Sequence, residues 1–269
     1  MPLLTLTSDI GNTDYLVGAI KAQLMQMNET FQLVDVSHAI PPFNLPQAAY
    51  VCRSAIQYFP DYSYHLILVN LFEQPPKQLL LAFHNNQYLL CADNGLLTMI
   101  LEETPELVIG IPLDKEQGYN TIQLVAVMGN VVNQLAEGQS IQRIGNPDVT
   151  YMQKTHLRPV IGNNQIACQI IYIDSFENII VNITKEQFEE QRQGRKFQIV
   201  LRRSEVIDKI SETYSSVPEG EKLALFNSAG YLEIAINKGN AAGLFGLYSY
   251  SEKLTQGQLS YHTVRIFFI

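Results

Sequence analysis

The spacing of apolar residues changes near the middle of the chain, and this change constrains the fold more than any other feature. In the first half, short apolar runs alternate with stretches whose apolar residues recur at helical spacing. Residues 3–8 are predicted to form a buried strand, and residues 13–27 a helix with Thr13 as its N-cap. Alternation of this kind predicts an α/β domain with a mostly parallel sheet covered by helices.

The second half lacks this alternation. From residue 159 onward, short apolar strands are separated by polar loops that contain glycine, a pattern typical of a small antiparallel barrel or sandwich. The charged stretch at residues 185–196 is interpreted as a solvated loop. Residues 145–164 have the Pro, Gly and Asn density of a linker. We therefore predict an α/β domain at 1–155 and a smaller, all-β, barrel-like domain at 156–269.

Composition and charge exclude several classes of function. The 269 residues are 46% hydrophobic and 16% charged, which is typical of a folded globular protein. The formal net charge of −8 argues against nucleic acid or an anionic membrane surface as the main partner. No stretch has the ~18 consecutive apolar residues that a membrane span needs. Three cysteines in apolar segments predict buried free thiols and a cytoplasmic protein, and the histidines lack metal-ligand spacing.

Polar residues follow two of the predicted strands. Asp9 and Asp14 flank a Gly-bearing turn in TSDIGNTDYLVG. A carboxylate at this end of a strand can accept both hydroxyls of a ribose, but on the pattern alone turn formation by Asp9 and helix capping by Asp14 are the favoured interpretation. The loop VNLFEQPPK contains Asn70, Glu73 and Lys77 after a second buried run. It is either an active-site loop or a polar turn between strands.

Three further stretches admit both a structural and a functional interpretation. Residues 93–95 (DNG) are interpreted as a plain turn after a buried strand. In YIDSFENIIVNI, a β-run is interrupted by Asp174, Phe176 and Asn178, which indicates either a hairpin turn or a binding edge where Phe stacks on a purine. NSAGYLEIAINKGNAA has the pattern of a hairpin, and Ser228 with the Gly-rich backbone can hold a polar ligand.

Taken in order, five stretches resemble the S-adenosylmethionine (SAM) hydroxide adenosyltransferases, whose relatives include the SAM-dependent fluorinase and chlorinase. The stretches are TSDIGNTDYLVGAIKA, DVSHAIPPFNLPQAAY, ADNGLLT, IDSFENIIVNI and NSAGYLEIAINKGNAA. They extend over nearly the whole chain. The resemblance implies an α/β domain that binds SAM or its nucleoside, followed by a β-barrel. It also implies a homotrimer with ligand sites between subunits, and no cofactor.

The nucleoside-binding part of the family pattern is matched. The resemblance implies that Asp9 takes the ribose hydroxyls and that Phe43 packs on the ligand. Asn178 and the backbone near Lys238 are implied to meet the adenine. Asp14, in the same turn as Asp9, is a further candidate ligand residue.

The methionine part of the ligand is implied to lie against the second domain. Asp174 and Ser228 would hold its amino and carboxylate ends, and Phe176 would line the pocket.

The catalytic part of the family pattern is not matched. Water-using members take an Asp and an Arg from a VDPGVGTxR-like loop and a His from an FHGRDxFAPVAA-like segment. These positions hold Asn70, Lys77 and Gln117 in this chain, with Gly118 beside the last. A neutral amide has no carboxylate to accept a proton, and lysine lacks the planar fork of arginine.

Three functions follow as hypotheses. The favoured one is an enzyme that converts SAM and water to adenosine and methionine, with Glu73, or less favourably Glu116, as a relocated base. The second is a catalytically degenerate protein that senses or sequesters SAM or adenosine. The third is adenosyl transfer to a different nucleophile, since a changed nucleophile needs changed neighbours.

Overall fold

The computed structural model describes residues 1–114, 116–202, 205–247 and 263–269. The chain divides into two compact units, Met1–His156 and Leu157–Ile269, each with its own hydrophobic core. Within the described ranges, no helix is long and apolar enough to cross a membrane.

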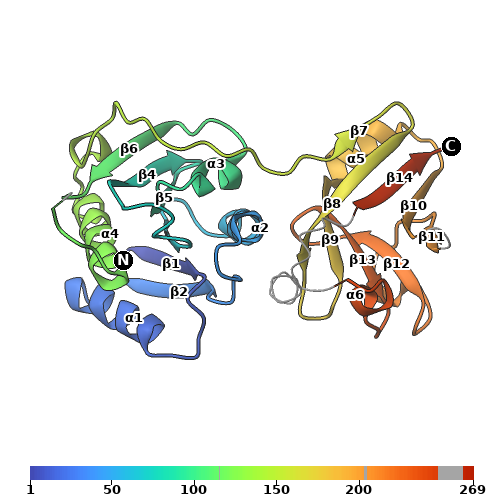
Figure 1. Ribbon diagram of the computed structural model, residues 1–269, viewed down its shortest axis with the longest axis horizontal. Coiled ribbons are helices and arrows are strands. Elements are labelled where there is room, and N and C mark those ends of the chain that lie inside the picture. The colour runs from blue at the N-terminus through green and yellow to red at the C-terminus, as the bar shows by residue number, and fades with distance from the viewer. Residues whose placement is uncertain (115, 203–204, 248–262) are drawn as a thin grey trace. The chain divides into compact units, whose positions relative to one another are not determined.

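The first unit is built on a six-stranded sheet with the order β2-β1-β3-β5-β4-β6 (Figure 1). Strands β2, β1, β3 and β5 pair in parallel, whereas β4 is antiparallel to both β5 and β6. Five strands thus run in one direction, as the predicted, mostly parallel sheet requires. The strands are β1 (Leu3–Ser8), β2 (Gln32–Ser37), β3 (Tyr64–Leu68), β4 (Gln78–His84), β5 (Gln87–Ala92) and β6 (Leu107–Pro112).

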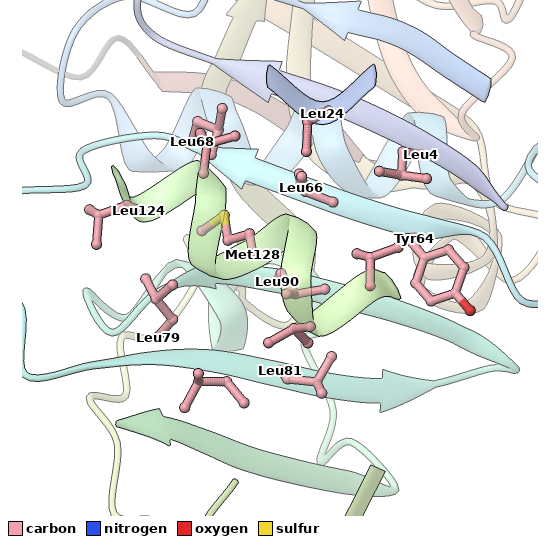
Figure 2. Close-up of a cluster of buried hydrophobic side chains, with 14 of the residues drawn as sticks. Leu4, Leu24, Tyr64, Leu66, Leu68, Leu79, Leu81, Leu90, Leu124 and Met128 are labelled. Atoms are coloured by element: carbon pink, nitrogen blue, oxygen red, sulfur yellow. The ribbon is translucent and has the colours of Figure 1, made fainter. Parts of the chain in front are cut away.

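Helices cover both faces of this sheet because its strands are apolar on both sides. Leu66 and Leu68 of β3 point toward one face, where they pack with residues of α1 and α4 such as Leu24 and Met128 (Figure 2). Ile67, between them, belongs to the core under α2 and α3 on the other face. The helices are α1 (Leu16–Met27), α2 (Leu45–Ile56), α3 (Leu96–Leu101), α4 (Thr121–Ala136) and the short 3₁₀ helix η1 (Ile141–Arg143).

The second unit is an antiparallel, nearly closed barrel-like sheet. Its strand order is β11-β10-β14-β8-β9-β13-β12, with β7 paired to β8. A bridge between Ile210 and Ala224 links the segment after β11 to β12 and nearly closes the sheet. The elements are β7 (Val160–Ile161), β8 (Gln165–Ile173), β9 (Ile179–Thr184), α5 (Lys185–Arg192), β10 (Phe197–Arg202), β11 (Glu205–Ile207), η2 (Tyr214–Ser216), β12 (Lys222–Phe226), β13 (Tyr231–Ile236), α6 (Ala241–Leu244) and β14 (Thr263–Phe268).

The predicted fold class is confirmed, but two local predictions are wrong. Helix α1 begins at Leu16, so Thr13 is not its N-cap. The stretch at 185–196 contains α5 rather than only a loop, because Thr184 and Gln187 form a capping box and Phe188 is fully buried among aromatic rings. Phe188 is the one buried residue of this helix. One apolar residue is too few to show the helical spacing from which a helix is predicted.

His65 is a buried histidine inside the parallel sheet. Its Nδ1 lies 2.7 Å from Thr5 Oγ1 on the neighbouring strand, and its ring packs edge-on against Phe59. Burial lowers the pKa of His65 from 6.5 to about 4. Because the folded pKa is below the unfolded one, the stability that the neutral imidazole provides is present above pH 6.5 and is lost as the pH falls toward 4.

We therefore expect the free energy of unfolding to fall by roughly 3 kcal/mol from this residue alone between pH 6.5 and 4. In His65→Gln, which keeps a hydrogen-bonding group beside Thr5 but does not titrate, this part of the fall should be absent. Urea denaturation at pH 7.5 and at pH 4.5 measures the difference. An equal fall in the variant and the wild type would contradict the assignment.

Candidate functional site

The carboxylate of Asp9 joins three loops at the carboxyl end of the parallel strands. Asp9 follows β1, and its Oδ2 accepts hydrogen bonds from the backbone N–H groups of Phe43 and Asn70, both at 3.1 Å. Phe43 precedes α2 and Asn70 follows β3. Both donor residues have positive φ, 64° and 47°, which is unusual for phenylalanine. The structure thus brings together three residues that the sequence singled out.

Asn94 fixes the loop that Asn70 begins. Its side chain is buried, and its Nδ2 donates to the carbonyl oxygens of Val69 and Asn70, each at 3.0 Å. Its Oδ1 accepts from the N–H of Leu96 at the start of α3. The sequence interpretation of residues 93–95 as a plain turn overlooked this role. Asn94 reaches Asn70 because β5 lies beside β3, and the two strands are neighbours only in the folded sheet.

Glu73 is held by an amide and by an ammonium group. Asn70 Nδ2 donates to Glu73 Oε2 at 3.0 Å. Lys154 Nζ lies 2.8 Å from Glu73 Oε1 and 3.0 Å from Oε2. Lys154 was not predicted as a site residue, and no local pattern points to it, because it is 81 residues from Glu73 in the chain.

Other predicted residues of this unit are not joined to that group. Lys77 is exposed on the same loop as Glu73, and Gln117 and Gly118 are exposed on the loop between β6 and α4. Neither the Lys77 nor the Gln117 side chain bonds to another residue in the described part of the chain. Asp14 Oδ1 accepts from the N–H of Leu16, the first residue of α1, at 2.9 Å.

A small cavity lies beside Glu73, with a volume of about 60 Å³. This volume has room for water molecules but not for a nucleoside. Its walls are the loop between β3 and β4, the first residue of β4, and the end of β5 with the two residues that follow it. The lining residues are Leu71, Glu73, Gln74, Pro75, Pro76, Lys77, Gln78, Ala92, Asp93 and Asn94.

Three predicted residues of the second unit meet in the turn between β8 and β9. Asp174 Oδ1 accepts from the N–H groups of Phe176 and Asn178, at 2.9 and 2.8 Å, and Oδ2 accepts from Asn178 Nδ2 at 3.1 Å. Asn178 is buried, whereas the Phe176 side chain is 77% exposed at the tip. The turn therefore presents an aromatic ring from a backbone that a single carboxylate holds in place.

Glu233 is a buried carboxylate beneath this turn that the sequence interpretation missed. It is 3% exposed on β13, and its Oε1 accepts from Tyr214 Oη at 2.7 Å. Burial raises the pKa of Glu233, and the nearby charge of Asp174 raises it further, against hydrogen bonds from Tyr214, Asn227 and Asn178. A lone glutamate inside the apolar run YLEIAI was the available signal.

The two remaining predicted residues lie on turns of the same unit. Ser228 is in the turn between β12 and β13, where Asn227 Oδ1 accepts from the N–H groups of Ala229 and Tyr231. Lys238 follows β13 with a φ of 53°, and its Nζ donates to Glu219 at 2.9 Å on the surface.

Comparison with known proteins defines the class to which this fold and this group of residues belong. The family model of the SAM hydroxide adenosyltransferase N-terminal domain matches residues 4–145, and the model of the C-terminal domain of the same family matches residues 168–252. The chain therefore belongs to the SAM hydroxide adenosyltransferase family, a family of enzymes.

Two similar proteins are each named (R)-S-adenosyl-L-methionine hydrolase. The protein from Methanocaldococcus jannaschii is 27% identical over 261 residues, covering 92% of this chain and 93% of the relative. The protein from Thermus thermophilus is 28% identical over 251 residues, covering 89% and 94%.

Two crystal structures share the fold. An uncharacterized conserved protein from Thermotoga maritima has a TM-score of 0.81 at 23% identity, covering 99% of both chains. A conserved hypothetical protein from Thermus thermophilus has a TM-score of 0.71 at 23% identity, covering 100% of this chain and 99% of the other.

Asn94→Ala should destabilise the first unit. The substitution leaves two carbonyl oxygens and one N–H group without their buried partner, so we expect the free energy of unfolding to fall by roughly 1–3 kcal/mol. Urea denaturation measures the fall. Gln26→Ala on the exposed side of α1 is the control, with an expected change within about 0.5 kcal/mol. A change as small for Asn94→Ala would mean that Asn94 does not support the loop.

Glu233→Gln should alter how stability depends on pH. Because the folded pKa of Glu233 is raised above its ordinary value of 4.5, the contribution of this group to stability is present below pH 4.5 and is lost as the pH rises through the raised pKa. The glutamine variant has no such loss, so its stability relative to the wild type should increase from acidic to neutral pH. Urea denaturation across this range measures the trend, and a difference that does not vary with pH would disprove it.

Proposed function

We propose that this protein hydrolyses SAM, with water replacing methionine at the 5′ carbon of the ribose. The water oxygen forms a bond to that carbon while the carbon–sulfur bond breaks. The electron pair of the broken bond goes to sulfur, which turns the sulfonium into the neutral thioether of methionine, and a base takes the released proton. Because the leaving group is already activated, the protein mainly has to position and desolvate the water.

The observation that carries this proposal is the bridge that Asn70 makes between Asp9 and Glu73. The backbone N–H of Asn70 donates to Asp9, and its side-chain amide donates to Glu73. If Asp9 holds the ribose hydroxyls, Glu73 is fixed relative to the sugar through one residue. We assign Glu73 as the base, because it is a carboxylate beside a cavity with room for water. In this assignment, Asn70 orients the base instead of acting as one.

The remaining roles follow the family resemblance. Phe43 packs on the ligand, and Asn178 with the backbone near Lys238 meets the adenine. Asp174 and Ser228 take the methionine amino and carboxylate ends, and Phe176 lines the pocket. The similarity to proteins named SAM hydrolases supports SAM as the ligand.

The proposal extends to the state of the protein. A homotrimer with ligand sites between subunits follows from the family resemblance. A cytoplasmic location is in keeping with three buried cysteines that are all free thiols.

A second candidate function is a SAM- or adenosine-binding protein without turnover. The observation that favours it is the exposure of Lys77 and Gln117, the residues at two of the family's catalytic positions. Adenosyl transfer to a different nucleophile is the third candidate, and it uses the same ligand residues.

Glu73→Gln tests the assignment of Glu73 as the base. If Glu73 is the base, kcat should fall by roughly 10²–10⁴, because an amide cannot take the proton of water. Glutamine has nearly the same shape as glutamate, so the loop should keep its conformation. Formation of adenosine from SAM, followed by chromatography, measures the rate. Glu29→Gln, an exposed substitution on the turn after α1, is the control with an expected wild-type rate.

Other outcomes reassign the function. An unchanged rate in Glu73→Gln together with a large loss in Glu116→Gln would move the base to Glu116. A wild type that binds SAM in calorimetry but forms no adenosine above the uncatalysed background would be a sensor or sequestering protein. Turnover only in the presence of an added nucleophile would support the third candidate.

A further inference from the structure

The last residues of the first unit follow the α/β sheet in the chain, and hydrogen bonds hold them to α3 and to the residues after β5. The N–H of Met152 donates to Asp93 Oδ1 at 2.7 Å. Two residues later, the N–H of Lys154 donates to Thr98 Oγ1 at 2.9 Å, and the Thr98 hydroxyl lies at hydrogen-bond distance from the Lys154 carbonyl, also 2.9 Å. These bonds determine where the Lys154 side chain starts, beside α3 and the end of β5.

The aliphatic part of Lys154 then crosses Gly95. A Cβ atom at Gly95 would lie 2.5 Å from Lys154 Cγ and 2.7 Å from Cδ, both far inside van der Waals contact. Gly95 also has a φ of +86°, which favours glycine for a separate reason. The lysine stem is therefore packed along a path that any larger residue at position 95 would block.

At the end of this path the ammonium contacts both oxygens of Glu73. The distances are 2.8 Å to Oε1 and 3.0 Å to Oε2, and Oε2 also receives the Asn70 amide. Lys77 is nearer to Glu73 in sequence, but its side chain is exposed and contacts no carboxylate within the described residues. The positive charge beside Glu73 therefore comes from the last residues of the first unit, which follow the α/β sheet in the chain.

We propose that Lys154 is a positioning residue for the reaction: its ammonium, with the Asn70 amide, fixes the orientation of the Glu73 carboxylate beside the water cavity. This inference rests on the proposed role of Glu73 as the base. A carboxylate has about four lone-pair sites, so the three donor contacts leave one for water. Oε1, which receives only Lys154 among the described residues, is the oxygen that takes the water proton.

Lys154→Met removes the ammonium and keeps most of the stem. Because a small misplacement of a catalytic group can cost up to about 100-fold, we expect kcat to fall by roughly 10- to 100-fold. KM for SAM should stay within about twofold, since Lys154 orients the base and does not contact the ligand. Lys154→Arg should restore most of the lost kcat, because the guanidinium also binds a carboxylate through two hydrogen bonds. In the Glu73→Gln background, Lys154→Met should cause no further loss, because the two residues act as a unit.

A matched ion pair in the second unit provides the control. Lys222 contacts Glu205, with side-chain exposures of 28% and 35%, close to the 33% and 32% of Lys154 and Glu73. Lys222→Met should resemble Lys154→Met in its effect on stability and leave kcat unchanged. This comparison separates the loss of a surface ion pair from the loss of a positioning contact.

Each outcome is distinguishable from failure of the proposed function. Turnover by the wild type with an unchanged kcat in Lys154→Met would overturn the inference and leave the function standing. A raised KM with kcat intact would also overturn it, by making Lys154 a ligand-binding residue. A wild type without turnover would overturn the proposed function, and the inference with it. If circular dichroism shows that Lys154→Met is unfolded, Lys154→Gln carries the same test.

Discussion

The candidate site of the first unit depends on one carboxylate oxygen. Asp9 Oδ2 accepts two backbone N–H groups from loops that follow or precede different elements, and it thereby holds the ends of β1 and β3 and the approach to α2 in one arrangement. Asn70 is one of those donors, so its side chain and its carbonyl are placed at the same time. Asn94 takes the carbonyl and Glu73 takes the side-chain amide. A chain of hydrogen bonds thus runs from the proposed ribose site to the proposed base.

The family resemblance implies an acid at the position of Asn70, and the structure shows the contacts that the amide makes there. An asparagine cannot take a proton from water, but it can both donate and accept hydrogen bonds. In the proposed mechanism, basicity moves three residues along the loop to Glu73, while position 70 keeps the task of orientation. Methionine leaves the sulfonium as a neutral molecule, so the protein mainly has to position and desolvate the attacking water. In the proposed mechanism, a carboxylate at a new position in the loop is enough to take the proton of that water.

Much of the fold was predictable from local patterns. Apolar runs and helical spacing in the first half predicted the helix-covered sheet, and short strands in the second half predicted the barrel-like unit. Helix α5 was not predicted because Phe188 is its one buried residue, and a capping box alone is a weaker signal than apolar periodicity. The start of α1 was misplaced because Asp14, not Thr13, meets the first turn of the helix. Both errors concern single side-chain contacts at the end of an element.

The sequence by itself determined the change from α/β to all-β architecture and the polar residues that stand at strand ends, because both are encoded in the spacing of neighbouring residues. Only the tertiary structure decided which of those residues meet. Asn94 and Asn70 come together because β5 lies beside β3, and Lys154 reaches Glu73 across 81 residues because Thr98 and Gly95 fix its path. Such contacts depend on how the strands and helices pack, and no local pattern in the chain specifies them.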